Sequence, residues 1–338
     1  MRLNYLTIFL LLLFIHPLSA EPIGMVTGSK TGTYLQFGKD IAAISKKSGT
    51  YVLVSPSKGS IDNIKRMMSR ENAAFAIVQS DVLGYLSKSS NPKFRRAAKR
   101  LRLIFPFYNE EVHLFARKEI QTLNDLQGKT IVVGPKSSGT NMTAWNILKI
   151  TGVKPAKRLN LAVNEGIKLV LKNKADAVFV VAGKPRPGFS NLFNTSKKSV
   201  QAMLQQVHFV PLNDPSLLTE YERSDLSTQD YSFIQTNVPT IAVKALLVSF
   251  DFSSTKSSYY RQRCQQLNGI ANAIRQNINT LRLKHHKKWN QVDLNGDMSG
   301  WTIDKCSHSV QMKNNKRPVR SNKSGIDYDI ACSFDGSC

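Results

Sequence analysis

The segment from Ile23 to Ala42 constrains the fold more than any other part of this 338-residue chain. Its sequence, IGMVTGSKTGTYLQFGKDIA, places an apolar strand before a turn of glycine, serine and threonine, and an amphipathic helix after the turn. The free N–H groups and the positive dipole end of such a helix start bind carboxylate or phosphate groups. Similar turns follow at Ser80 (SDVLG) and at Pro135 (PKSSGTN). The sequence therefore predicts an α/β protein that binds a small acid.

Residues 1–20 have the three parts of a secretory signal peptide. Arg2 supplies the positive charge, residues 6–15 form an apolar core, and the sequence LSA at residues 18–20 precedes Glu21. The core is about half of the roughly 20 residues that a membrane-spanning helix needs. We therefore expect cleavage after Ala20 and a mature protein located in the periplasm.

The mature chain of 318 residues is strongly basic. The signal peptide holds one of the 47 Lys and Arg residues and none of the 23 acids, so the mature protein carries a net charge of +23. Such a charge attracts nucleic acid, anionic lipid or an acidic solute. Nucleic acid is the least consistent of these, because the charge is spread along an exported chain. The densest cluster, Lys93–Arg102, is typical of a solvated helix face. Solute steering and attraction to an anionic membrane both stay open.

All four cysteines lie in the last quarter of the chain. An even number in an oxidising compartment predicts two disulfides, for which three pairings are possible. We favour Cys264 with Cys306 and Cys332 with Cys338. These bonds would staple a C-terminal extension rather than take part in catalysis.

Strand and helix patterns alternate along the chain and form two similar sets. The first set has predicted strands at 23–27, 51–55, 74–78 and 101–106, and helices at 33–47, 60–69 and from Asp81. The second set has predicted strands at 112–117, 130–133 and 177–181, and helices at 123–128, 141–150 and 165–171. A strand at 241–250 and a long helix at 259–288 complete the pattern.

This alternation predicts an α/β fold of two lobes, with mainly parallel sheets flanked by helices and a two-strand hinge near 106–111 and 236–240. The predicted parts are the signal peptide 1–20, lobe 1 at 21–106 and 241–290, lobe 2 at 107–240, and a Cys-containing extension at 291–338. Ligand sites of such folds lie at the carboxyl ends of strands and between domains.

The candidate ligand-binding residues occupy three turns at predicted strand ends. An ordinary helix cap also explains each turn by itself. Tyr34 can hydrogen-bond or cover the ligand, and Asp81 can accept an amino group or act only as a cap. The candidates are Gly28, Ser29, Thr31, Gly32, Thr33 and Tyr34 in the first turn, Gln79, Ser80 and Asp81 in the second, and Ser137, Ser138, Gly139 and Thr140 in the third.

The order and spacing of several motifs between Ile23 and Lys288 resemble the TAXI family, the solute-binding subunits of one class of TRAP transporters. The motifs are TGSKTGTY from Thr27, KGSIDN from Lys58, AIVQSD from Ala76, EVHL from Glu111, LNDLQGK from Leu123, GPKSSGT from Gly134 and VPTIAV from Val238. The resemblance implies a type II periplasmic binding protein that closes on glutamate, glutamine or a related small carboxylate. It also implies delivery of that solute to a TRAP-type membrane permease.

The resemblance adds Lys58, Gly183 and Lys184 to the candidate site. The family tends to have a neutral GGxPNP loop where this chain has AGKPRP at 182–187. The two cations there can favour a more acidic ligand or simply face solvent. The tail from Trp289 goes beyond the family pattern, and its role is open.

Motifs for other chemistries do not fit. The run from Gly24 lacks the spacing of a nucleotide phosphate loop, and residues 293–304 lack the glycine and glutamate of a calcium loop. No histidines stand at metal-ligand spacing, and no GxSxG elbow appears. We therefore expect a monomeric binding protein that is not an enzyme and needs no metal or cofactor. The alternatives are an exported ligand-sensing or adhesive protein on the same fold and, less favoured, a secreted hydrolase.

Overall fold

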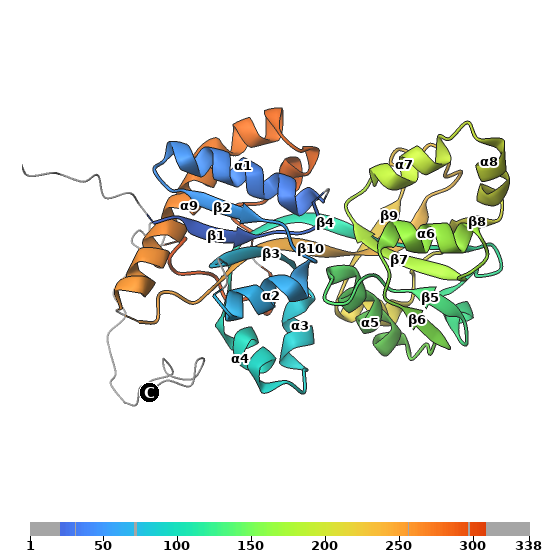
Figure 1. The fold of residues 1–338 in the computed structure, drawn as a ribbon, viewed down its shortest axis with the longest axis horizontal. Helices are drawn as coiled ribbons and strands as arrows, with labels where there is room; N and C mark the ends of the chain where they lie inside the picture. Colours follow the sequence, from blue (N-terminus) through green and yellow to red (C-terminus); the bar gives the residue numbers. More distant parts are fainter. Residues whose placement is uncertain (1–20, 31, 71–72, 256, 297, 309–338) are drawn as a thin grey trace, which may run out of the picture.

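The computed structural model describes residues 21–308 apart from 31, 71–72, 256 and 297. Its strands form one ten-stranded sheet that extends through two lobes (Figure 1). Lobe 1, as we use the term, contains β1 (Ile23–Val26), β2 (Val52–Ser55), β3 (Phe75–Gln79), α1 (Thr33–Lys47), α2 (Ser60–Met68), α3 (Val82–Ser87), α4 (Pro92–Arg100) and α9 (Ser258–Lys284).

Lobe 2 contains the elements from the middle of the chain. They are η1 (Leu123–Leu126), β5 (Thr130–Val132), α5 (Gly139–Thr151), β6 (Lys157–Leu159), α6 (Val163–Leu171), β7 (Ala177–Ala182), α7 (Pro187–Phe193), α8 (Lys198–Leu204), β8 (Val207–Phe209), η2 (Pro215–Thr219) and β9 (Glu222–Leu226). Each lobe has parallel strand pairs: β1 with β2 and β3, and β5 with β6 and β7.

Two long strands, β4 (Leu101–Arg117) and β10 (Val238–Phe250), pair antiparallel and pass from one lobe to the other (Figure 1). They form the two-strand hinge of an α/β fold with two lobes. No residue of these strands marks a break between lobes, so the lobe boundaries given above stay predictions.

The expected break between strands at 101–106 and 112–117 is wrong, because β4 is continuous through Pro106. Pro106 lies opposite Leu246, beside a shift in the pairing register between Lys244 and Leu246. A bulge of this kind tolerates proline within a sheet, since ladder hydrogen bonds are interrupted there.

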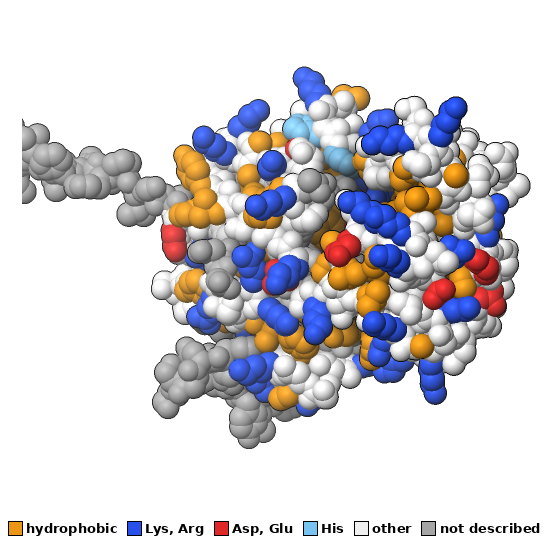
Figure 2. Space-filling view, turned by 45° about the vertical axis from the view of Figure 1, so that its right-hand side comes forward, with side chains coloured by type: hydrophobic (Ala, Val, Ile, Leu, Met, Phe, Trp, Pro, Cys, Tyr) orange, Lys and Arg blue, Asp and Glu red, His pale blue; other side chains and the backbone are white. Residues whose placement is uncertain are grey.

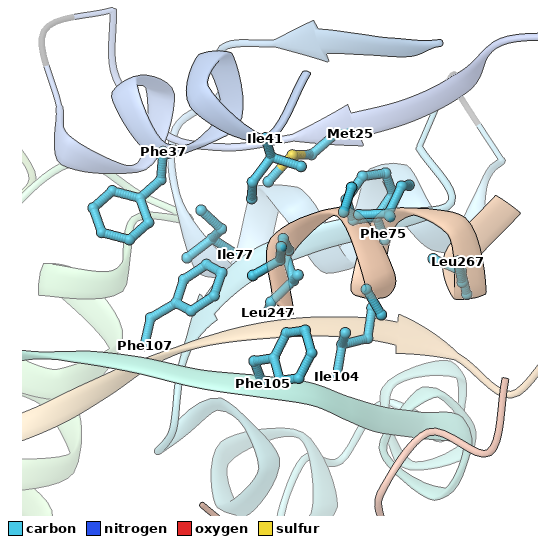
Figure 3. Close-up of a cluster of buried hydrophobic side chains, with 14 of the residues drawn as sticks. Met25, Phe37, Ile41, Phe75, Ile77, Ile104, Phe105, Phe107, Leu247 and Leu267 are labelled. Atoms are coloured by element: carbon cyan, nitrogen blue, oxygen red, sulfur yellow. The ribbon is translucent and has the colours of Figure 1, made fainter. Parts of the chain in front are cut away.

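Each lobe has apolar clusters on both faces of its sheet. In lobe 1, α1 and α9 cover one face and α2 to α4 cover the other. Figure 3 shows the first of these clusters, where Phe37 and Ile41 of α1 and Leu267 of α9 meet strand residues such as Phe105. In lobe 2, α5 covers one face and α6 to α8 cover the other. The clusters explain why the apolar periodicity of these segments predicted helices on both faces.

The chain after α9 returns to lobe 1. The helix ends at Lys284 rather than at the expected residue 288, because His285 is extended and its Nδ1 lies 2.9 Å from Asp40 Oδ1. A short 3-10 helix, η3 (Lys287–Gln291), follows and places Trp289 in the lobe 1 core. Residues 291–296 and 298–308 of the predicted extension then pack on the same lobe, with Ile303 bridging to Leu103 of β4.

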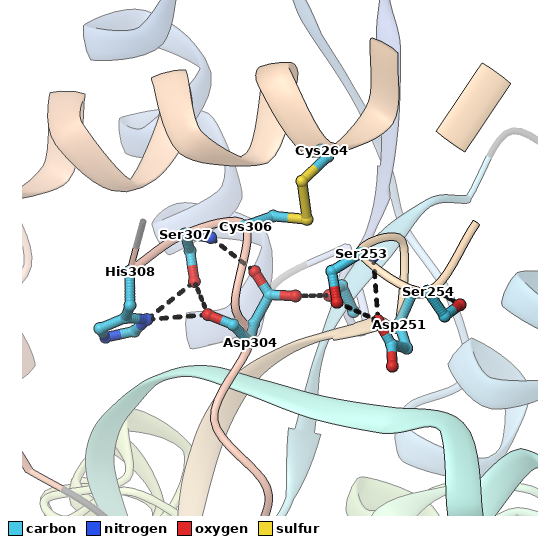
Figure 4. The surroundings of a disulfide bond; sticks show 9 residues. Asp251, Ser253, Ser254, Cys264, Asp304, Cys306, Ser307 and His308 are labelled. Carbon is cyan, nitrogen blue, oxygen red and sulfur yellow. Dashed lines mark hydrogen bonds between the residues drawn. A yellow bond between two sulfur atoms is a disulfide. The ribbon is translucent and has the colours of Figure 1, made fainter. Parts of the chain in front are cut away.

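The disulfide between Cys264 of α9 and Cys306 is present, which confirms one of the two favoured pairings (Figure 4). Cys332 and Cys338 lie outside the described residues. Asp304, which stood in the rejected calcium pattern, is buried and accepts hydrogen bonds from Ser307 N and Ser249 Oγ.

Candidate functional site

The candidate site is the seam where the two lobes touch, at the carboxyl ends of β1, β3 and β5. The first turn leads into α1 with Gly32 as an extended N-cap that has no side-chain cap. Among the described residues, the N–H groups of Thr33 and Tyr34 have no hydrogen-bond acceptor. Thr31 lies outside the described residues. The open amides make the start of α1 suitable for an anionic group.

Tyr34 connects this helix start to the hinge. Its buried hydroxyl donates to Oε2 of Glu110 at 2.7 Å, and Glu110 is itself buried in β4. Burial raises the pKa of Glu110 to about 7, although the Tyr34 hydrogen bond and the charge of Lys288 oppose the shift. A carboxyl group that changes charge near neutral pH therefore lies beside the start of α1.

Lys288 lies beside this carboxyl and extends the polar cluster across the hinge. Its Nζ donates to Asn109 O at 2.9 Å and lies 3.6 Å from Oε2 of Glu111. The turn at Gly183 passes so close that an added Cβ would lie 2.7 Å from Lys288 Cε. Lys288 is buried, and burial lowers its pKa while both glutamates oppose the shift. This lysine thus connects the segment after α9 with the hinge and with lobe 2.

The start of α5 meets lobe 1 at the middle of the seam. Ser138 caps the helix, since its Oγ accepts from Asn141 N at 3.1 Å. An added Cβ on Gly139 would lie 1.8 Å from Oε1 of Gln79, and one on Gly59 would lie 3.1 Å from Gly139 N. Only glycine at 139 allows this close approach of backbone and side chain. A hydrogen bond from Asp62 N to Ser137 O, at 3.2 Å, also joins the lobes.

Asp81 of lobe 1 binds lobe 2 directly. Its Oδ2 accepts from Thr143 Oγ1 at 2.8 Å, from Tyr221 Oη at 3.2 Å and from Asn146 Nδ2 at 3.4 Å. Its Oδ1 is buried and has no hydrogen-bond partner among the residues that the structure describes. Burial raises the pKa of Asp81 to about 6, against the effect of these donors. Asp81 therefore does not cap α3 with its side chain but holds the two lobes together.

Several other candidates are engaged within one lobe. The Ser80 Oγ accepts from Lys244 N, the Thr140 Oγ1 accepts from Val181 N, and Lys58 is exposed. The Nζ of Lys184 pairs with Asp225 at 2.8 Å and with Asp230 at 3.0 Å inside lobe 2. Gly28 lies against the Tyr34 ring, while Ser29 is exposed near the start of α1.

The seam thus brings together Tyr34, Gln79, Asp81, Ser138 and Gly139 from the three predicted turns. Sequence reasoning missed six residues that join them, namely Glu110, Glu111, Thr143, Asn146, Tyr221 and Lys288. Of these, Glu111 had stood in one of the quoted motifs. Spacing from Asp81 to Tyr221 gives no local signal, since only the fold brings residues 140 positions apart into contact.

The two lobes are joined by two long strands and meet along a polar seam. A model of the NMT1-like family matches residues 25–260, and the chain belongs to this family. A search of curated proteins found no match.

Solved structures with a similar fold are distant in sequence. A histidine kinase sensor domain with similarity to periplasmic binding proteins is 11% identical, with a TM-score of 0.46, over 81% of this chain and 98% of that one. The BenM effector-binding domain with benzoate is 14% identical, with a TM-score of 0.39, over 79% and 96%. YhfZ from Shigella flexneri is 13% identical, with a TM-score of 0.42, over 78% and 93%.

Two further findings concern the helices and the surface. No helix among the described residues is long and apolar enough to cross a membrane. Lys and Arg side chains are spread over the face shown in Figure 2, with few acidic side chains among them. The distribution on this face agrees with a general positive field rather than a single basic patch.

The buried Glu110 predicts a pH-dependent stability. Its pKa is higher in the folded state, so the folded protein holds the proton longer than the unfolded chain, and stability falls as the pH rises from about 4.5 to about 7. Glu110→Gln keeps an oxygen for Tyr34 but cannot ionise. We expect the free energy of unfolding of the variant, measured in urea relative to the wild type, to rise by about 2 to 3 kcal/mol between pH 5 and pH 8.

The exposed Glu119, which pairs with Arg117 at 2.8 Å, provides the control. The Arg117 hydrogen bond lowers the pKa of Glu119, so this carboxyl stays ionised between pH 5 and pH 8. Because Glu119 is exposed, Glu119→Gln removes no buried charge. If the difference between Glu110→Gln and wild type stayed constant over this pH range, the carboxyl would not be titrating in the folded protein.

Proposed function

We propose that this chain is a periplasmic solute-binding protein that captures a small carboxylate between its lobes, with glutamate or a related compound as the preferred class. The carrying observation is the convergence of the α1 and α5 starts, from opposite lobes, on one buried polar seam. Backbone amides at these starts supply the anion-binding groups.

The acids of the seam support a ligand that also carries an amino group. Asp81, Glu110 and Glu111 are buried there, and the unpartnered Oδ1 of Asp81 is free to accept a donor. A simple dicarboxylate would meet these acids without compensation, whereas an ammonium group would pair with them. An amino acid such as glutamate places a carboxylate at the helix starts and its ammonium beside the acids.

The contacts of Asp81 support closure as the binding mechanism. Its three lobe 2 donors can form hydrogen bonds only when the lobes are together. A ligand shifts the lobes toward this state by the difference between its affinities for the closed and open forms. We infer that the closed form delivers the solute to a TRAP-type permease, and that the protein acts as a monomer without catalysis.

A thermal-shift screen of the mature protein tests this proposal. We expect glutamate or glutamine to raise the melting temperature in a saturable way, because a ligand that binds only the folded state stabilises it. The screen includes 2-oxoglutarate and C4-dicarboxylates, which lack the ammonium. No shift with any of these acids, on protein freed of carried-over ligand, would favour the ligand-sensing or adhesive alternative instead.

Variants of the helix starts test the site itself. Tyr34→Phe removes the hydroxyl that bonds Glu110, and Ser138→Ala removes the cap that orders the first turn of α5. We expect each to weaken binding of the active acid by up to about tenfold in calorimetry, since one lost hydrogen bond is worth about 0.5 to 1.5 kcal/mol. Ser254→Ala, at an exposed position of lobe 1, serves as the control. Unchanged affinity in both seam variants would place the ligand elsewhere.

A further inference from the structure

A groove beside α5 of lobe 2 is lined by described residues other than those of the seam. Its volume is about 360 Å³, within the range of small-molecule sites. Val133, at the end of β5, and Arg158, on β6, line it together with one face of α5. That face presents Asn141, Trp145 and Leu148, at the spacing of one helical side.

The helix α5 separates the two places. Two side chains of α5, Trp145 and Met142, also contact lobe 1 residues. The side chains that bond Asp81 at the seam are Thr143 and Asn146. These positions lie two and five residues beyond Asn141, on the other side of a helix with 3.6 residues per turn. A molecule in the groove therefore does not occupy the seam.

The polar lining of the groove is basic. Lys136 and Arg158 both line it and both are exposed. Within the part of the chain that the structure describes, neither side chain has an ion-pair or hydrogen-bond partner, and no lining residue is acidic. Two uncompensated cations in one concavity favour an anion, and a guanidinium can bind a carboxylate or phosphate with two parallel hydrogen bonds.

The remaining walls suit a flat apolar group. Trp145 keeps 40% of its surface exposed, although Lys149 Nζ lies over one face of its ring, 5.0 Å from the centroid. Val133 and Leu148 also line the groove, but both are buried. The carboxamides are held in place, since Asn160 Nδ2 donates to Gly134 O at 3.2 Å and Asn141 Nδ2 to Val133 O at 3.5 Å. The groove thus combines a fixed polar rim, an indole and two free cations.

We propose that this groove is a second binding site, for a small organic anion that carries a planar ring. The ring packs against Trp145 while the anionic group pairs with Lys136 and Arg158. Trp145 also contacts Tyr85 of α3 edge-on, with ring centroids 5.8 Å apart. An occupant of the groove therefore touches a residue that bridges the lobes, next to but outside the seam.

Calorimetry on the mature protein tests the proposal with two ring-bearing anions, 4-hydroxybenzoate and adenosine monophosphate, and two ringless ones, acetate and inorganic phosphate. We expect at least one ring-bearing anion to bind with a Kd below about 1 mM and the ringless ones to bind at least tenfold more weakly. Arg158→Ala, Lys136→Ala and Trp145→Leu are each expected to weaken that binding about tenfold. Lys157→Ala changes an exposed cation beside Arg158 that does not line the groove, and is expected to leave affinity unchanged.

The outcome is independent of the seam. The groove variants are expected to keep the wild-type melting temperature and the wild-type response to the acid found in the screen. If instead no acid binds at the seam, the calorimetry with ring-bearing anions still tests the groove by itself. Absence of heat with both ring-bearing anions at about 10 mM would overturn it. Equal affinity of wild type, Arg158→Ala and Lys136→Ala for a bound anion would also overturn it.

Discussion

Trp289→Ala is expected to lower the free energy of unfolding by about 4 kcal/mol, the usual cost of removing a large aromatic side chain from a core. Trp289 is fully buried and stacks on Phe37 with ring centroids 4.2 Å apart. Its Nε1 also donates to Oδ2 of the buried Asp40 at 2.9 Å. The alanine variant leaves a cavity and removes a donor from a buried carboxylate, and urea unfolding at pH 7 measures the sum.

Two variants separate these contributions. Trp289→Phe keeps a ring against Phe37 but loses the bond to Asp40, so we expect a loss of about 1 to 3 kcal/mol. Trp301→Ala removes the same side chain from a half-buried position on the same segment, and its cost is expected to be clearly smaller than that of Trp289→Ala. Similar losses for Trp289→Ala and Trp301→Ala would mean that residue 289 is not part of the lobe 1 core.

The buried position of Trp289 also shows what the sequence could not indicate. Trp289 follows a basic helix end and precedes a polar stretch, so no periodicity marks it as a core residue. Its partner Phe37 lies about 250 residues earlier, and only the return of the chain after α9 brings them together. The sequence left the role of the segment from Trp289 open for this physical reason.

Local patterns predicted most of the architecture. The turns after β1 and β5 carry glycine, serine and threonine because a strand must end and a helix must begin within a few residues. Ser138 acts as the cap that its sequence suggested. Each of these features depends on neighbours within about four residues, and such features are readable from one sequence.

The interactions across the seam were not readable. The carboxylate of Asp81 looked like a cap or a ligand group, yet its Oδ2 is occupied by three donors from lobe 2. Glu110 gave no signal at all, because its meaning comes from Tyr34, 76 positions away. Contacts of this kind depend on the register of β4 and on how the lobes meet, and neither is encoded in a local motif.

Loss of the Cys264–Cys306 bond is expected to destabilise lobe 1 by about 4 kcal/mol, from the loop entropy of a crosslink between residues 42 apart. The bond pins the segment after α9 to the helix itself, next to the hydrogen bonds of Asp304 and Ser307 (Figure 4). The double variant Cys264→Ser/Cys306→Ser, compared with wild type in urea unfolding, measures this contribution.

Ser307→Ala is the matched control, because it removes a side-chain hydrogen bond from the same turn while the disulfide stays intact. We expect it to cost about 1 kcal/mol. Peptide mapping of the non-reduced protein checks the pairing and also tests the second predicted bond, Cys332 with Cys338. If Cys264 were found joined to either of those two, or if the double variant matched wild type in stability, the segment 291–308 would be held by its packing and hydrogen bonds alone. A larger loss of stability for the double cysteine variant than for Ser307→Ala would instead mean that the disulfide contributes more than this hydrogen bond to holding the segment. The same segment carries Trp289 and Lys288 beside the hinge.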